Sequence, residues 1–170
     1  AAAARSLTGE LIPMEASSAG MGKLGFTLRV PIGVVAAISP FNFPLNLVAH
    51  KVAPAIAAGC PVVLKPASST PLTALLLADL LEGDAGLPPG WLNVVTVPGS
   101  VADALVTHED VAAITFTASP DVGWGIRAKA PRKRVGLELG NNAPVIVHRD
   151  ADVAAAAKKI TVGGYGYSGQ

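Results

Sequence analysis

The stretch at residues 31–69, PIGVVAAISPFNFPLNLVAHKVAPAIAAGCPVVLKPASS, alternates between two kinds of pattern. Short apolar runs at 33–39 and 61–65 are typical of buried strands. Between them, the run at 45–59 is typical of a helix that ends at a glycine, Gly59. A strand, a helix and a second strand in succession favour a βαβ unit with parallel strands. This stretch therefore predicts an α/β fold.

The same alternation continues through the rest of the chain. The predicted strands are nearly continuous runs of Val, Ile and Leu, as expected where helices cover both faces of a sheet. They lie at 91–97, 112–117, 134–139 and 143–147, and helices are predicted at 70–86, 100–108, 119–130 and 152–160. Thr70 and Ser119, each followed by proline, are the expected N-caps of two of these helices. We predict a doubly wound, Rossmann-like parallel sheet of about five strands.

Three regions are expected along the chain. Residues 1–32 suggest a helix remnant, a loop rich in Gly and Ser, and one strand. Residues 33–160 hold the βαβ alternation and are predicted to form a dinucleotide-binding α/β domain. Residues 161–170 are expected to begin a segment that leads into a further domain.

Composition narrows the classes of function. The net charge of +1 provides no long-range field for nucleic acid or a membrane surface, and no apolar run approaches the roughly 20 residues that span a bilayer. The cations at 127–134 are interpreted as a solvated patch, and the three histidines have no metal-ligand spacing. The single cysteine, Cys60, is interpreted as a small core residue. We expect a cytoplasmic protein without a metal site and without nucleic-acid or membrane partners.

Small and polar residues follow the predicted strands. In open parallel sheets, ligands bind outside the carboxyl ends of the strands. The segments found there are SPFNFP (39–44), KPASS (65–69), PGS (98–100), ASPDVG (118–123) and ELGNN (138–142). The fingerprint G-x-G-x-x-G is missing, but a helix that opens at Ser119 could hold a pyrophosphate with its free N–H groups. This edge is predicted to form a nucleotide cleft.

Three of these residues have both a structural and a chemical interpretation. Asn42 either makes a loop turn or points its amide at an oxyanion. Lys65 is either a surface lysine at a strand end or a ligand for a ribose or a phosphate. Glu138 is either solvated or, in a partly closed cleft, a usable base near neutral pH.

Taken in order, PIGVVAAISPFNFPLNLVAHKVAPAIAAGCPVVLKPASSTPLTAL, ITFTASPDVG and VGLELGNNAPVIV strongly resemble the aldehyde dehydrogenase superfamily. The resemblance runs through residues 5–170. It implies an enzyme that oxidises a small-molecule aldehyde to an acid with NAD or NADP. The family reaction proceeds by attack of a thiolate, hydride transfer to the cofactor and hydrolysis of the thioester.

The resemblance also implies roles for individual residues. Asn42 matches the asparagine that stabilises the oxyanion of the thiohemiacetal, and Glu138 matches the general base that activates water. Lys65 is similar to the lysine at the adenosine ribose, and Ser119 to the serine at the pyrophosphate. The expected cofactor-binding residues are Ser39, Pro40, Phe41, Lys65, Ser68, Gly99, Ala118, Ser119, Val122, Leu139 and Gly140. Ser39, Pro40 and Phe41 would line the nicotinamide side.

Three departures from the family pattern modify these expectations. Many NAD-preferring members have Glu at the position of Ser68, and its loss removes a carboxylate that would repel a 2′-phosphate. We therefore expect NADP to be tolerated. Ala118 replaces a usual glycine and could crowd the phosphate, whereas Asn141 replaces another glycine more mildly.

The chain stops at Gly169-Gln170, and in the resembled family the nucleophilic cysteine lies just beyond such a pair. The sequence is therefore interpreted as an internal fragment of the coenzyme-binding domain, inactive alone, from a parent enzyme expected to be a homo-oligomer. Two alternatives remain: a non-catalytic dinucleotide-binding or structural relative, and an acylating semialdehyde dehydrogenase.

Overall fold

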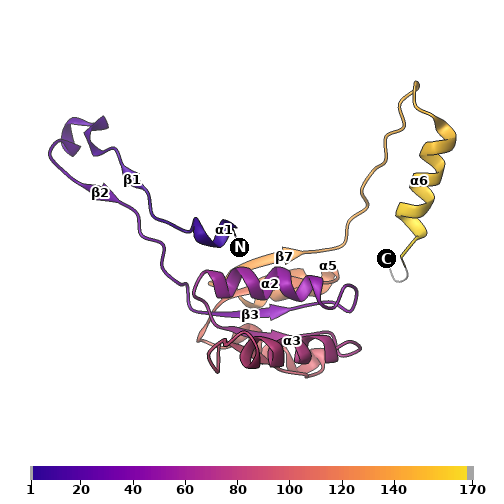
Figure 1. Cartoon of the computed structure of the whole chain (residues 1–170), viewed down its shortest axis with the longest axis horizontal. Coiled ribbons are helices and arrows are strands. Elements are labelled where there is room, and N and C mark those ends of the chain that lie inside the picture. Colours follow the sequence, from indigo (N-terminus) through magenta and orange to yellow (C-terminus); the bar gives the residue numbers. More distant parts are fainter. Residues whose placement is uncertain (1, 168–170) are drawn as a thin grey trace. The chain divides into compact units, whose positions relative to one another are not determined.

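A computed structural model describes residues 2–167 (Figure 1). By their internal contacts the residues group into two units, Ala1–Leu139 and Gly140–Gln170. The expected boundaries after residues 32 and 160 stay predictions, and the Gly169-Gln170 pair lies outside the described residues.

The first unit is built on a five-stranded sheet in the order β5-β4-β3-β6-β7, with every neighbouring pair parallel. Its strands are β3 (Val34–Ile38), β4 (Val62–Lys65), β5 (Leu92–Val94), β6 (Val111–Thr117) and β7 (Arg134–Glu138). The prediction of a parallel α/β sheet of about five strands is confirmed.

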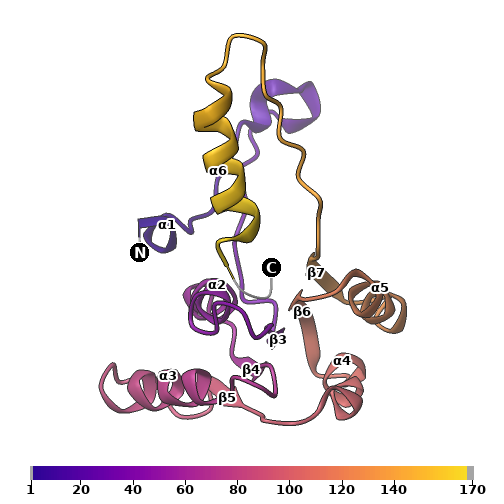
Figure 2. The ribbon, with the colours of Figure 1, turned by 90° about the vertical axis from the view of Figure 1, so that its right-hand side faces the viewer.

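Helices cover both faces of this sheet, as the end-on view in Figure 2 shows. One pair is α2 (Asn46–Ala57) and α3 (Leu72–Gly83), and the other is α4 (Asp103–Thr107) and α5 (Pro120–Lys129). The successive residues of β3 alternate between the two cores. Val35 and Ala37 pack with α2 and α3, whereas Ala36 and Ile38 pack with α4 and α5. A strand buried on both faces must be apolar at every position, which explains the unbroken GVVAAI run.

The chain leaves α2 through a Schellman turn around Gly59. The N–H of Gly59 donates to the carbonyl of Ile56, and the N–H of Cys60 donates to that of Ala55. Gly59 has a φ of +77°, so the predicted glycine C-cap is confirmed. Cys60 is buried in the core beside α2, as expected.

Three local expectations are wrong. Thr70 does not cap α3, because its buried hydroxyl has no hydrogen-bond partner in the described part of the chain and the helix starts at Leu72. The third connection, between β5 and β6, forms a short helix, η3 (Gly99–Val101), and then α4, in place of one helix at 100–108. Before β3, one strand was expected, but two short strands form and pair antiparallel. The elements of this segment are α1 (Ala2–Arg5), β1 (Leu11–Ile12), η1 (Met14–Ala16), η2 (Ser18–Gly20) and β2 (Gly25–Phe26).

The second unit contains an extended segment and one helix, α6 (Val153–Tyr165). Asp152 caps this helix by accepting a hydrogen bond from the N–H of Ala155. The strand predicted at 143–147 does not form: this segment has no strand partner in the described residues, and Ile146 is 90 % exposed. A strand gains its stability from a neighbour, so β-propensity alone did not produce one.

Candidate functional site

The carboxyl ends of β4, β3, β6 and β7 lie side by side, in this order, along one end of the sheet. Register pairs Ile38 of β3 with Lys65 of β4, and Thr117 of β6 with Glu138 of β7. The backbone bonds continue past the strands, because the N–H of Ser39 donates to the carbonyl of Lys65 over 3.2 Å. With about 4.8 Å between strands, Lys65 and Glu138 stand at backbone positions roughly 14 Å apart. We call this end of the sheet the polar rim.

Lys65 is a buried lysine and not a snorkelling surface side chain. It is 6 % exposed, and its ammonium donates to the carbonyl of Pro66 over 3.0 Å. Burial lowers the pKa of Lys65, because the charged form loses water. An ammonium with three donors and one such partner is well suited to bind hydroxyl or phosphate oxygens.

The loop after β3 holds the next group of expected residues. Ser39 is 4 % exposed, and its hydroxyl has no hydrogen-bond partner among residues 2–167. Asn42 is half-buried and precedes Phe43, which has a φ of +49°. A non-glycine residue in that region costs of order 1 kcal/mol. The backbone oxygen of Phe43 accepts from the N–H of Leu47, which ties this bent loop to the start of α2.

The helix α5 begins at the rim immediately after β6. Ser119 is its N-cap residue by position, but its side chain makes no capping bond. No capping side chain therefore accepts from the free N–H groups of the first turn of α5. These N–H groups and the Ser119 hydroxyl could bind an anion. Ala118, Ser119 and Val122 are all exposed here.

Glu138 ends β7 with its carboxylate exposed. The hydroxyl of Thr117, on the adjacent strand, donates to Oε2 of Glu138 over 3.0 Å. Thr117 in turn accepts from the ammonium of Lys51 over 2.6 Å. Sequence reasoning did not select Lys51 or Thr117. The available signal was that Lys51 lies in the apolar stripe of α2, between the buried Val48 and Val52.

The remaining expected residues are dispersed. Ser68 is exposed in the turn after β4, and Gly99 is exposed where η3 begins. Pro40 is half-buried and Phe41 is exposed. Leu139 packs against the core on the α5 side, whereas Gly140 opens the second unit, so its place relative to the rim stays a prediction.

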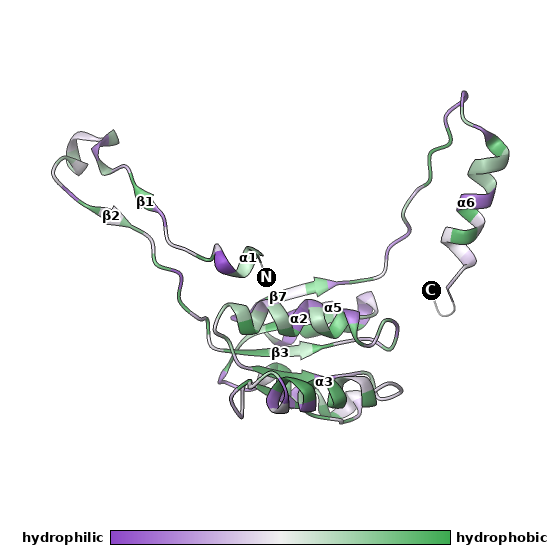
Figure 3. Cartoon of the chain, viewed as in Figure 1, coloured by the Kyte–Doolittle hydropathy of each residue, from purple (hydrophilic) through white to green (hydrophobic). Residues whose placement is uncertain are grey.

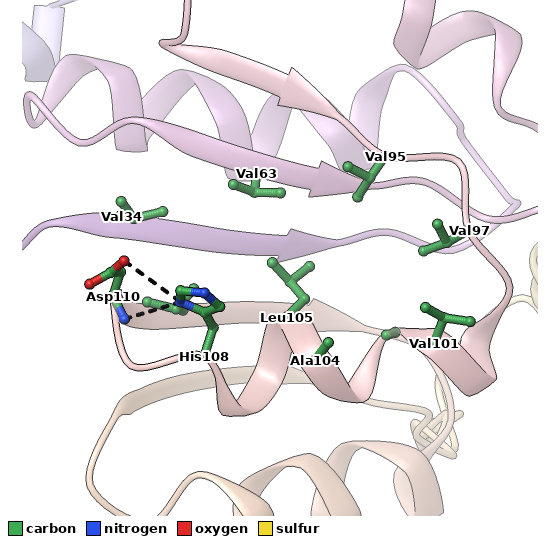
Figure 4. A pocket seen from close by; sticks show the side chains of 11 residues that line it. Val34, Val63, Val95, Val97, Val101, Ala104, Leu105, His108 and Asp110 are labelled. Carbon is green, nitrogen blue, oxygen red and sulfur yellow. Dashed lines mark hydrogen bonds and ion pairs between the residues drawn. The ribbon is translucent and has the colours of Figure 1, made fainter.

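A separate apolar pocket of about 450 Å³ lies beside α4 (Figure 4). Its walls come from β3, β4, the segment after β5, and α4, and its polar end carries His108 and Asp110. Figure 4 shows valines from three sheet segments pointing into it, opposite Leu105 of α4. None of the expected site residues lines this pocket.

The described residues, 2–167, contain neither a metal-binding cluster nor a membrane-spanning helix. No group of three or more His, Cys, Asp or Glu side chains is arranged to hold a metal ion. Within the same residues, no helix has the length and apolar character needed to cross a membrane.

Known proteins resemble this chain in both sequence and fold. The chain is 50 % identical over 168 residues to 3-sulfolactaldehyde dehydrogenase of Priestia aryabhattai. This match covers 98 % of the chain and 35 % of that protein. The crystal structure of NADP-dependent glyceraldehyde-3-phosphate dehydrogenase from Bacillus halodurans, complexed with NADP, superposes with a TM-score of 0.91. It is 43 % identical, and the match covers 98 % of this chain and 35 % of that one.

A second solved structure, NAD-dependent aldehyde dehydrogenase from Sinorhizobium meliloti, gives a TM-score of 0.88 at 43 % identity. That match covers 96 % of this chain and 32 % of the other. The chain therefore spans about a third of the length of the relatives it matches.

The parallel five-stranded sheet and its solved neighbours define a Rossmann-like α/β protein. The sequence profile of the aldehyde dehydrogenase family matches residues 1–170, and the chain belongs to that family.

Proposed function

We propose that this chain is the coenzyme-binding part of an NAD(P)-dependent aldehyde dehydrogenase that oxidises an aldehyde to a carboxylic acid. The supporting observation is the polar rim, where Lys65, Ser39, Thr117 and Glu138 follow one another along adjacent strand ends. Family membership and the identity of 43 % to a structure complexed with NADP point to the same chemistry.

The residues of the rim fit a dinucleotide. The buried ammonium of Lys65 has donors to spare for ribose hydroxyls, and the buried hydroxyl of Ser39 has no partner within the described residues. Ser119 and the first turn of α5 would hold the pyrophosphate, with Gly99 and Val122 beside it. When bound, the cofactor supplies an acceptor for the hydride of the substrate.

The chemistry at the nicotinamide end needs two groups from this chain. Asn42 would donate its amide N–H to the oxyanion that forms when a thiolate attacks the aldehyde carbonyl. Glu138 would take a proton from the water that hydrolyses the resulting thioester. We propose that the thiolate belongs to a cysteine outside these 170 residues, since Cys60 is buried in the core beside α2 and is not available to a substrate.

Cofactor choice is proposed to depend on Ser68. This side chain is exposed in the turn after β4, next to the strand that ends in Lys65. Without a carboxylate at this position, a 2′-phosphate meets no close negative charge from the turn. We propose that both NAD and NADP bind.

Two other functions remain candidates. The exposed carboxylate of Glu138 favours a hydrolytic enzyme over an acylating one that passes the acyl group to coenzyme A or phosphate. A non-catalytic dinucleotide-binding relative would retain Lys65 and Ser119 without turnover.

The experiment uses the complete protein that contains this chain. It should reduce NAD(P) with an aldehyde and release the free acid, whether or not coenzyme A is present. Replacing Glu138 with glutamine should slow hydrolysis by about 100-fold or more, because a general base is lost. Acyl-coenzyme A as the sole product would support the acylating alternative, and cofactor binding without turnover would support the non-catalytic one.

A further inference from the structure

A lysine is buried where α2 crosses the sheet. Lys51 is 3 % exposed, although most lysines keep their ammonium in water. Its ammonium reaches the face of β6, where it donates to Thr117 over 2.6 Å and to Thr115 over 3.3 Å. These two threonines are alternate residues of one strand, so their hydroxyls point to the same face.

The hydrogen bonds of Thr117 have a fixed direction. An ammonium can only donate, so the hydroxyl oxygen of Thr117 accepts from Lys51. The one hydroxyl hydrogen is then free to point at Oε2 of Glu138, over 3.0 Å. Without Lys51, that hydrogen could rotate toward another acceptor. The lysine thus orients a hydroxyl that in turn orients the carboxylate.

Charge links the two ends of this chain of hydrogen bonds. Burial lowers the pKa of Lys51, and the negative charge of Glu138 opposes that shift. Within residues 2–167, Glu138 is the charged group that acts on the ammonium of Lys51. A lysine kept for packing alone would gain nothing from a carboxylate at the sheet edge.

We propose that Lys51 is a positioning residue for Glu138 and acts through the hydroxyl of Thr117. This inference rests on the proposed role of Glu138 as the base of the hydrolytic step. Thr115 accepts from the same ammonium over a longer distance, and the hydroxyl that donates to Glu138 is that of Thr117, so Thr115 supports the lysine without belonging to the positioning chain. A carboxylate that is held at one oxygen keeps its other oxygen available for water.

The test replaces threonine with valine, which removes a hydroxyl and keeps the shape. Thr117→Val breaks the chain of hydrogen bonds between Lys51 and Glu138. Thr115→Val is the matched control on the same strand. Thr117→Ser keeps the hydroxyl and should therefore keep function. The complete protein is assayed with p-nitrophenyl acetate, which acylates a nucleophilic cysteine and releases p-nitrophenolate. The fast burst then reports acylation and the later steady rate reports hydrolysis.

We expect Thr117→Val and Lys51→Met to lower the steady rate about 10- to 100-fold while the burst keeps its amplitude. Thr115→Val should lower it less than about threefold, and Thr117→Ser should stay within a similar factor of the wild type. A purely structural role would change the burst and the steady rate together. If Lys51→Met does not fold, the three threonine variants still give the answer.

Glu138→Gln separates this inference from the function beneath it. If Glu138→Gln is slow and Thr117→Val keeps the wild-type steady rate, the positioning role is wrong and the proposed base stands. If Glu138→Gln keeps the wild-type rate, the proposed role of Glu138 itself is wrong. Equal losses in Thr115→Val and Thr117→Val would also overturn the inference, because the defect would then follow the lysine's packing.

Discussion

At the scale of single residues, the α/β unit contains two buried lysines. Lys51 is 3 % exposed and Lys65 is 6 % exposed, and burial lowers the pKa of each. A buried ammonium costs stability unless it is well paired. Lys51 has two hydroxyl acceptors and a nearby carboxylate, whereas Lys65 has one backbone carbonyl. This difference is consistent with the proposal that Lys65 completes its bonding with a cofactor.

The buried charge of Lys65 predicts a pH dependence of stability. Its pKa in the folded chain lies below the ordinary value of 10.5 that it regains on unfolding. Between these two values the unfolded chain binds more protons, so the free energy of unfolding should rise with pH in that window. As the pH rises toward 10.5, we expect the free energy of unfolding in urea to rise more steeply for the wild type than for Lys65→Met. Parallel curves for the two proteins would contradict this.

Ser68 predicts how the cofactor preference can be changed. We expect the complete protein to bind both NAD and NADP, and Ser68→Glu to weaken NADP by about tenfold or more through repulsion of the 2′-phosphate. Dissociation constants for both cofactors, measured by fluorescence titration, test this. Ser69→Glu, on the exposed neighbouring residue, controls for added charge. A strong preference for NAD in the wild type would count against the prediction.

At the scale of elements, the C-terminal turn of α2 is tightly constrained. Gly59 has a φ of +77°, and a Cβ there would lie 2.8 Å from Cγ of Pro31. The turn leads directly into β4, whose last residue is Lys65. A change in this turn therefore affects the strand that carries a rim residue.

We expect Gly59→Ala to lower the free energy of unfolding by about 1–2 kcal/mol, because alanine is strained at positive φ. The matched control is Gly83→Ala at the end of α3, where a Cβ meets nothing within 4 Å. That change should be neutral or slightly stabilising, since alanine favours helix. Equilibrium urea unfolding of both variants measures the difference, and equal effects would contradict the role of Gly59.

At the scale of the whole molecule, much apolar surface is uncovered. Figure 3 shows hydrophobic residues along the sheet and also along segments outside it, including α6. Large exposed side chains occur in both units, among them Leu24, Leu28, Val30, Trp124 and Ile146. Exposed apolar patches of this kind mark surfaces that associate.

We predict that these 170 residues, expressed alone, self-associate or are only marginally stable. Light scattering over a concentration series should show mass rising with concentration, and calorimetry should show a broad transition. Replacing Leu28 and Val30, which are exposed in the described chain, with serine should reduce the association. A monomer that melts sharply at all concentrations would show that the prediction is wrong.

Local sequence patterns determined the α/β architecture. Apolar runs such as GVVAAI read as strands because a central strand must be apolar on both faces, and Gly59 ended its helix because only glycine adopts that φ freely. Because parallel strands end at a common edge, the same reasoning brought Ser39, Lys65 and Glu138 to one rim.

Only the tertiary structure decided what depends on contacts between distant segments. It left residues 143–147 without a strand, because β-propensity needs a partner that the described chain does not supply. It also buried Lys51 of α2 against Thr117, which is 66 positions away in sequence, and thereby connected it to Glu138. Hydrogen bonds of this kind depend on how a helix crosses a sheet, and no local pattern of residues encodes that crossing.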